Sequence, residues 1–209
     1  MARVTMTDAL RTAIRNGEIA INCCLPGRIE SYDASTQKAS VKPLLRRLDR
    51  DGTEQSRPII TNVPVVWPRA GGAAMTMPVE RGDGVMVLFS DRSLDRWLSR
   101  GGEVTPDDRR VHDYSDAIAV PGLVPFADAE GHDDGGLVVG YPDGARAKLS
   151  DDGKVAIGND AEELLALFGE LLEALISATT ATAIGSQPLS EVPTFEQIRQ
   201  RLDEIKGSL

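Results

Sequence analysis

Two carboxylates stand four residues apart, Asp91 and Asp95, in the segment Asp-Arg-Ser-Leu-Asp-Arg-Trp. Paired carboxylates that flank a scissile bond are the catalytic groups of glycosidases. Residues at this spacing come together only if the segment is helical. Because arginines alternate with these carboxylates, the sequence favours local ion pairs over a catalytic pair.

A second set of residues has the composition of a hydrolytic triad, namely Ser90, His112 and Asp116. A serine nucleophile of the α/β-hydrolase type lies in a Gly-x-Ser-x-Gly turn, and no serine of this chain has that setting. We therefore expect His112 to support a loop at one end of a barrel, and we predict no catalytic residues.

Candidate metal ligands fall into two groups. The first contains oxygen and imidazole ligands without the spaced Asp-x-Asp-x-Asp-Gly pattern of a calcium loop, and we interpret it as a solvated linker: Asp128, Glu130, His132, Asp133 and Asp134. The second, Cys23 and Cys24, is a pair of neighbours that cannot form an unstrained disulfide, and no second Cys pair completes a zinc site. We interpret Cys23 and Cys24 as small apolar residues. From the two groups together we expect neither a bound metal nor a cofactor.

The charge balance argues against a nucleic-acid partner. The net charge is -9 and the pI is near 4.8, so phosphate backbones would repel the chain. A single-strand-binding barrel also needs stacking aromatics, which make up only 4% here. Local arginines lie beside Asp49, Asp51, Asp107 and Asp108 and indicate ion-paired loops or a docking rim: Arg46, Arg47, Arg50, Arg109 and Arg110.

The sequence predicts that a mainly β chain with an α-helical C-terminus positions these side chains. Apolar residues at helical spacing predict an N-terminal helix within residues 1–22, over 7–19 and capped by Thr7. Period-two runs then predict four or five strands within 23–127, separated by turn-forming residues, which suits a small barrel of the oligonucleotide/oligosaccharide-binding (OB) type. The strand runs lie at 29–31, 39–43, 63–67 and 85–89.

Residues 128–158 are predicted to be a linker followed by three short strands, near 137–139, 145–150 and 155–157. Three strands this short cannot bury a core of their own. We therefore expect an obligate oligomer in which three copies wind together as a short intertwined β-prism.

Residues 159–209 are predicted to form a helical hairpin. An apolar stripe runs from Ala161 to about Thr180, Gly185 and Pro188 interrupt it, and Thr194-x-x-Gln197 has the spacing of a capping box for a second helix. Nine acids against three bases give this segment a net charge of -6. The trimer interface is predicted to contain Val155, Ile157, Leu164, Phe168, Leu171, Ile198, Leu202 and Ile205.

Several motifs, taken in order, resemble the Gp138-like family of phage membrane-puncturing spike proteins. They span about residues 20–126 and read LPGRIESYD at 25–33, VPVVWPRAGG at 63–72, LFSDRSLDRW at 88–97 and HDYSDA at 112–117. The resemblance implies a homotrimeric central spike at the tip of a contractile tail baseplate, with an OB-fold collar below the tail hub.

The resemblance further implies that the spike is a virion component made in the host cytoplasm, which docks a hub protein and punctures the host outer membrane mechanically. A separate spike-tip protein is a further partner that it allows. The His-x-His pair that holds an apex metal in several such spikes is missing here, so no apex ion is expected. The alternative function is a tail-associated, envelope-degrading hydrolase.

Overall fold

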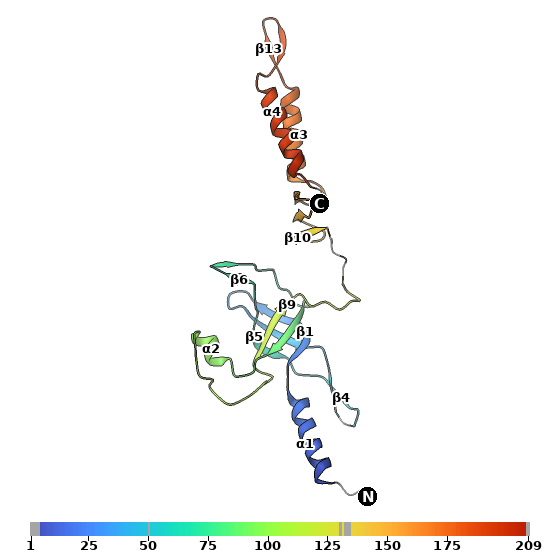
Figure 1. The fold of residues 1–209 in the computed structure, drawn as a ribbon, viewed down its shortest axis with the longest axis vertical. Helices are drawn as coiled ribbons and strands as arrows, with labels where there is room; N and C mark the ends of the chain where they lie inside the picture. Colours follow the sequence, from blue (N-terminus) through green and yellow to red (C-terminus); the bar gives the residue numbers. More distant parts are fainter. Residues whose placement is uncertain (1–4, 50, 130, 132–134, 208–209) are drawn as a thin grey trace. The chain divides into compact units, whose positions relative to one another are not determined.

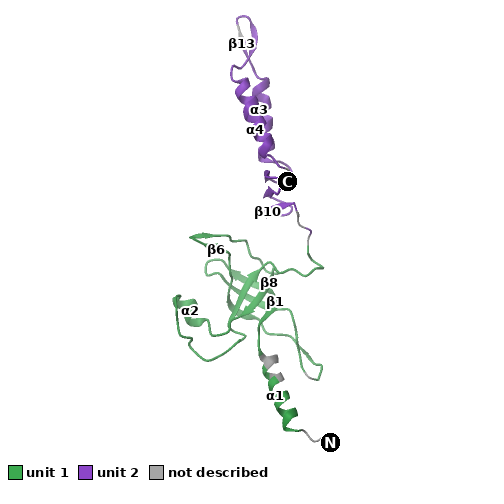
Figure 2. Ribbon diagram, viewed as in Figure 1, with its two compact units in different colours: residues 1–129 green, residues 130–209 purple. Residues whose placement is uncertain are grey.

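A computed structural model describes residues 5–49, 51–129, 131 and 135–207 of the chain. Its contacts divide the chain into two units, residues 1–129 and residues 130–209 (Figure 2).

The first unit begins with helix α1, Met6–Ala20. Its start is fixed by Thr5 and Asp8, which cap each other: the Asp8 backbone N–H donates to Thr5 Oγ1, and the Thr5 backbone N–H donates to the Asp8 carboxylate, both at 3.2 Å. This reciprocal arrangement satisfies two donors that a helix start leaves unpaired. The predicted helix is confirmed, but the predicted cap, Thr7, is wrong.

A five-stranded antiparallel sheet forms the centre of this unit (Figure 1). The spatial order is β5-β2-β1-β8-β9, so the first strand lies in the middle. The strands are β1 (Cys24–Asp33), β2 (Lys38–Pro43), β5 (Ile60–Pro64), β8 (Gly84–Phe89) and β9 (Ala117–Pro121). The predicted strand runs are confirmed for β1, β2 and β8. The predicted run at 63–67 overlaps β5 at residues 63–64, and β9 was not predicted.

The sheet packs its core through alternation along each strand. In β8, Val85, Val87 and Phe89 are buried while Leu88 between them is exposed, as a half-buried strand requires. Gly27 of β1 allows this core to close, because a Cβ placed there would lie 2.7 Å from a methyl group of Val87. Buried side chains from all five strands, with Val65 and Trp67, complete the core.

The sheet is curled, and its two outer strands meet. The Val66 backbone N–H donates to the Ala119 carbonyl at 2.9 Å, and Val65 forms an isolated parallel bridge with Ala119. Register shifts at 29–31 and 39–41 mark bulges, which bend a strand and increase its twist.

Three smaller elements leave this sheet. The predicted turn at Asp49–Gly52 joins β3 (Arg47–Leu48) to β4 (Glu54–Gln55), and the predicted glycine loop joins β6 (Arg69–Ala70) to β7 (Ala73–Ala74), with Gly71 and Gly72 at positive φ. The third element, helix α2 (Asp95–Arg100), was not predicted from the sequence.

The second unit starts with the three short strands that the sequence predicts. They are β10 (Gly136–Gly140), β11 (Arg146–Ser150) and β12 (Val155–Gly158), antiparallel and in that order. Ala156 is the only residue of this sheet within the described part of the chain that is fully buried.

Two helices follow, α3 (Leu164–Ser177) and α4 (Val192–Ile205), and they lie side by side (Figure 1). Between them, β13 (Thr179–Thr182) pairs with β14 (Gly185–Pro188), where the sequence predicted only an interruption. The predicted capping box is wrong, because α4 begins at Val192 after Glu191 and starts with Pro193 in its first turn. The chain is thus mainly β, with a curled sheet and C-terminal helices.

Candidate functional site

The second unit exposes large apolar side chains on one face of each of its helices. On α3, Leu164, Phe168 and Leu171 are each about half exposed, at 45, 48 and 54%. They recur every three or four residues and so share one helical face. On α4, Ile198 and Ile205 are exposed to a similar degree. Large apolar side chains clustered on one face mark an interaction site more often than scattered ones do.

A neighbouring side of α3, about 100° around the helix, is used within the chain. Leu165, Leu172 and Ile176 are half-buried there, and Leu202 of α4 lies 3.9 Å from the position that a Cβ on Gly169 would occupy. This distance is an ordinary van der Waals separation, so Leu202 packs against α3 at Gly169. Of the predicted interface residues, Leu202 packs within the chain, and the exposed ones on α3 and α4 are free to meet another chain.

Strand β10 also exposes apolar side chains on both of its faces within the described part of the chain. Leu137, Val138 and Val139 are consecutive and so point alternately to opposite faces, yet all three are exposed. A strand with apolar residues on both faces is typical of one buried on both sides. Ile157 of β12 is also exposed, and Val155 is half-buried.

The base of the helix pair is fixed to β12 by Glu163. Its carboxylate accepts hydrogen bonds from the backbone N–H groups of Leu165 and Ala166 in the first turn of α3, at 3.0 and 2.6 Å. It also accepts one from the backbone N–H of Ile157 in β12, at 3.1 Å. Although desolvation raises it, these bonds hold the pKa of Glu163 below its usual range.

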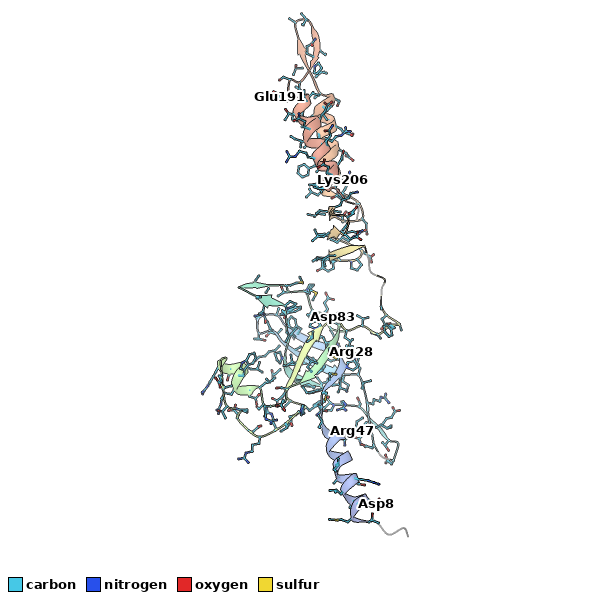
Figure 3. All side chains as sticks on the ribbon, viewed as in Figure 1. Asp8, Arg28, Arg47, Asp83, Glu191 and Lys206 are labelled. Atoms are coloured by element: carbon cyan, nitrogen blue, oxygen red, sulfur yellow. The ribbon has the colours of Figure 1, made fainter. Side chains whose placement is uncertain are left out.

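The end of α4 returns to the same strand. The Gly207 backbone N–H donates to the Val155 carbonyl at 2.8 Å, and Lys206 forms a parallel bridge with Val155. Lys206 and Glu191 mark the two ends of α4 in Figure 3. Both ends of the segment from α3 to α4 are thus held on β12, which makes the helix pair and the sheet one structure.

In the first unit, the polar centre is an ion-paired network around Arg110. Its guanidinium donates to the buried carboxylate of Asp116 at 2.6 and 2.8 Å, and also to Asp95 and Asp108. The backbone N–H of Leu94 donates to Asp116 as well, at 2.9 Å. These contacts tie α2 and the loop after it to the start of β9.

The sequence predicted local ion pairs for Asp91 and Asp95. Only the pair of Asp91 with the neighbouring Arg92 is local, because Asp95 pairs with Arg110 fifteen residues along the chain. Asp95 pairs with Arg110 at 2.6 Å and Asp91 with Arg92 at 2.9 Å, so each carboxylate is bound to a different arginine. Asp116 is bound to Arg110 and does not orient His112, whose Nε2 instead lies 3.6 Å from Asp91. The three residues Ser90, His112 and Asp116 are therefore not arranged as a triad.

The remaining candidates have structural surroundings. Arg47 pairs with Asp49 and Arg110 with Asp108, as expected for ion-paired loops, while Arg46 pairs with Glu54. Arg50, Glu130, His132, Asp133 and Asp134 lie outside the described residues. The described part contains no cluster of three or more metal-ligating side chains, Asp128 included. Cys23 and Cys24 are free thiols, and both are exposed rather than used as core residues.

Among the described helices, none has both the length and the apolar character needed to span a bilayer.

A family comparison connects the first unit to known proteins. Residues 25–122 match the model of the phage protein Gp138 N-terminal domain. The first unit therefore contains a Gp138-like phage N-terminal domain. No curated protein matches its sequence.

The Gp138 N-terminal domain coincides with the curled sheet. The match begins one residue into β1 and ends just after β9, so it includes the Arg110 network and all five strands. Helix α1 and the whole second unit lie outside it. The eight predicted interface residues therefore belong to the part of the chain that follows the domain.

Sequence reasoning missed two structural features of this second part. Glu163 could have been found as a carboxylate placed just before an apolar helical stripe, which is the usual position of a helix cap. The β13–β14 pair could have been found from threonines that alternate before Gly185, the signal of a short strand and turn.

Proposed function

We propose that this chain is a structural, tail-related phage protein that forms the trimeric central spike of a contractile tail baseplate. The Gp138 N-terminal domain supports the assignment to a phage structural protein. The spike role, the trimer and the puncturing of the host envelope extend that assignment.

The single observation that carries the trimer is the apolar surface of the second unit. Leu137, Val138 and Val139 expose both faces of β10, and Leu164, Phe168 and Leu171 expose one face of α3. Burying an apolar side chain of this size contributes about 1.5–3 kcal/mol. Copies of the chain that wind together would bury all of these residues, and a threefold arrangement needs no further chain type.

We infer that the first unit is an OB-type collar that docks the tail hub. The order β5-β2-β1-β8-β9 and the parallel bridge between Val65 and Ala119 support this, because they bring the sheet edges together as a small barrel requires. The ion-paired loop that Arg110 fixes would present a rigid rim to the hub.

The proposed action is mechanical. The force comes from contraction of the tail sheath, the host outer membrane is the surface contacted, and a separate spike-tip protein is a further partner. Nucleic acid is excluded from the proposed partners by the net charge of -9. The phage family suggests a non-enzymatic role, and the pairing of Asp91 and Asp95 with different arginines supports it.

Purified protein tests this function directly. Light scattering on dilute protein should give three times 22.4 kDa, and the protein should release no fragments from peptidoglycan or lipopolysaccharide. Release of such fragments at a catalytic rate would favour the alternative, an envelope-degrading hydrolase carried on the tail.

A further inference from the structure

We propose that the β13–β14 hairpin is a contact between copies of this chain, in which three identical hairpins meet at the end of the helix pairs. The inference rests on the proposed trimer and adds a site to it. It assigns a partner to a segment that lies outside the Gp138 N-terminal domain.

The hairpin is too small to be stable unaided. Its strands have four residues each, with Thr179 opposite Pro188 and Thr182 opposite Gly185. All of β14 is exposed, and Ile184 in the turn is 86% exposed. An isolated two-stranded hairpin is at best marginally stable in water, so this one needs a covering partner.

The hairpin also lacks the charges that usually protect an exposed strand edge. Residues 174–190 contain no Asp, Glu, Lys or Arg, although 159–209 as a whole carries nine acids and three bases. Natural edge strands are commonly protected by charged side chains against pairing with other chains. Two identical uncharged edges can pair without electrostatic repulsion, whereas two identical edges of like charge would repel each other.

The path of the chain places the hairpins of different copies together. Only Ala178 separates the end of α3 from the start of β13, so β13 continues directly from the helix. If the face formed by Leu164, Phe168 and Leu171 packs around a threefold axis, three copies of β13 emerge around that same axis. The hairpin contact is therefore continuous with the proposed trimer interface.

Cysteine cross-linking tests this contact. In a Cys23→Ser and Cys24→Ser background, Ile184→Cys places a thiol at the turn, where its side chain is exposed. Gln200→Cys, on the side of α4 away from Ile198, is the matched control. Groups held in one assembly have effective concentrations in the millimolar range, so at about 1 μM protein the turn thiol should cross-link roughly a thousandfold faster than independent chains.

The expected result is a cross-linked pair of chains, with the third chain of each trimer left unlinked, in a yield that dilution does not change. A mass of three chains with Ile184→Cys cross-linking no faster than Gln200→Cys would overturn the hairpin contact and leave the trimer standing. A monomeric mass would overturn both. Flotation of the uncross-linked protein with phosphatidylcholine–phosphatidylglycerol vesicles, lost in Ile184→Ser, would overturn the contact in favour of a lipid-binding turn.

Discussion

The carboxylate of Asp116 accepts two hydrogen bonds from the guanidinium of Arg110, at 2.6 and 2.8 Å, from a position that is 2% exposed. Removing one partner of such a pair leaves a buried charge without compensation. Arg110→Ala should therefore lower the free energy of unfolding of the first unit by about 3 kcal/mol. Denaturant titration measures the change.

Arg92→Ala is the control for that experiment, because its pair with Asp91 is exposed on both sides. Exposed pairs contribute less than about 1 kcal/mol. If Arg110→Ala and Arg92→Ala lowered the free energy of unfolding equally, the view that Arg110 fixes the loop to the sheet would be contradicted.

The same pair predicts a dependence of stability on pH. The hydrogen bond from Arg110 holds the pKa of Asp116 below its ordinary value, against the effect of desolvation. A carboxylate with a lowered folded pKa stabilises the folded state above its unfolded pKa, near 3.9, and loses that contribution as the pH falls through the folded pKa. Unfolding measured between about pH 2 and pH 7 should show this acid loss, and Asp116→Asn should flatten it.

Glu163 should stabilise the junction of sheet and helices. Glu163→Ala removes the cap of α3 and the hydrogen bond from Ile157, at a cost of about 1–2 kcal/mol. Hydrogen exchange at the amides of residues 157, 165 and 166 should become faster. The control is Glu162→Ala, because the neighbouring Glu162 side chain makes no such contacts among the described hydrogen bonds. This substitution should leave those exchange rates unchanged.

Phe168 and Leu202 should respond differently to substitution. Phe168 is exposed within one chain, so Phe168→Ser should weaken association while helicity in the assembled fraction is retained. Leu202 lies against α3, so Leu202→Asp places a charge in an apolar contact and should unfold both helices, with the first unit still folded. Circular dichroism with light scattering separates the two effects, and Gln200→Asp should produce neither.

Much of this architecture follows from local sequence signals, and the exceptions have physical reasons. The period of Val85, Val87 and Phe89 predicted a strand because each buried residue alternates with a less buried one. Strand β9 was not predicted because Ala117 and Ala119 are small and give a weak hydrophobic pattern. They form a strand because they pair with β8 in the folded sheet. The Arg110 network could not be predicted, because it joins residues that only the fold brings together.

The mechanical account predicts that the carboxylates of Asp91 and Asp95 are dispensable for chemistry. Asp91→Asn combined with Asp95→Asn removes acid–base function while keeping the shape of both side chains. Phage particles with this double variant should assemble and infect at the level of the parent. Particles that assemble normally but fail to cross the envelope would instead support an enzymatic role.

The mass of the purified protein in solution tests the central claim most directly. We propose that neighbouring chains cover the short strands β10, β11 and β12 and the exposed apolar faces of α3 and α4. Multi-angle light scattering on dilute protein should then give three times 22.4 kDa with no folded monomer. A monomer of 22.4 kDa that unfolds cooperatively would contradict the account.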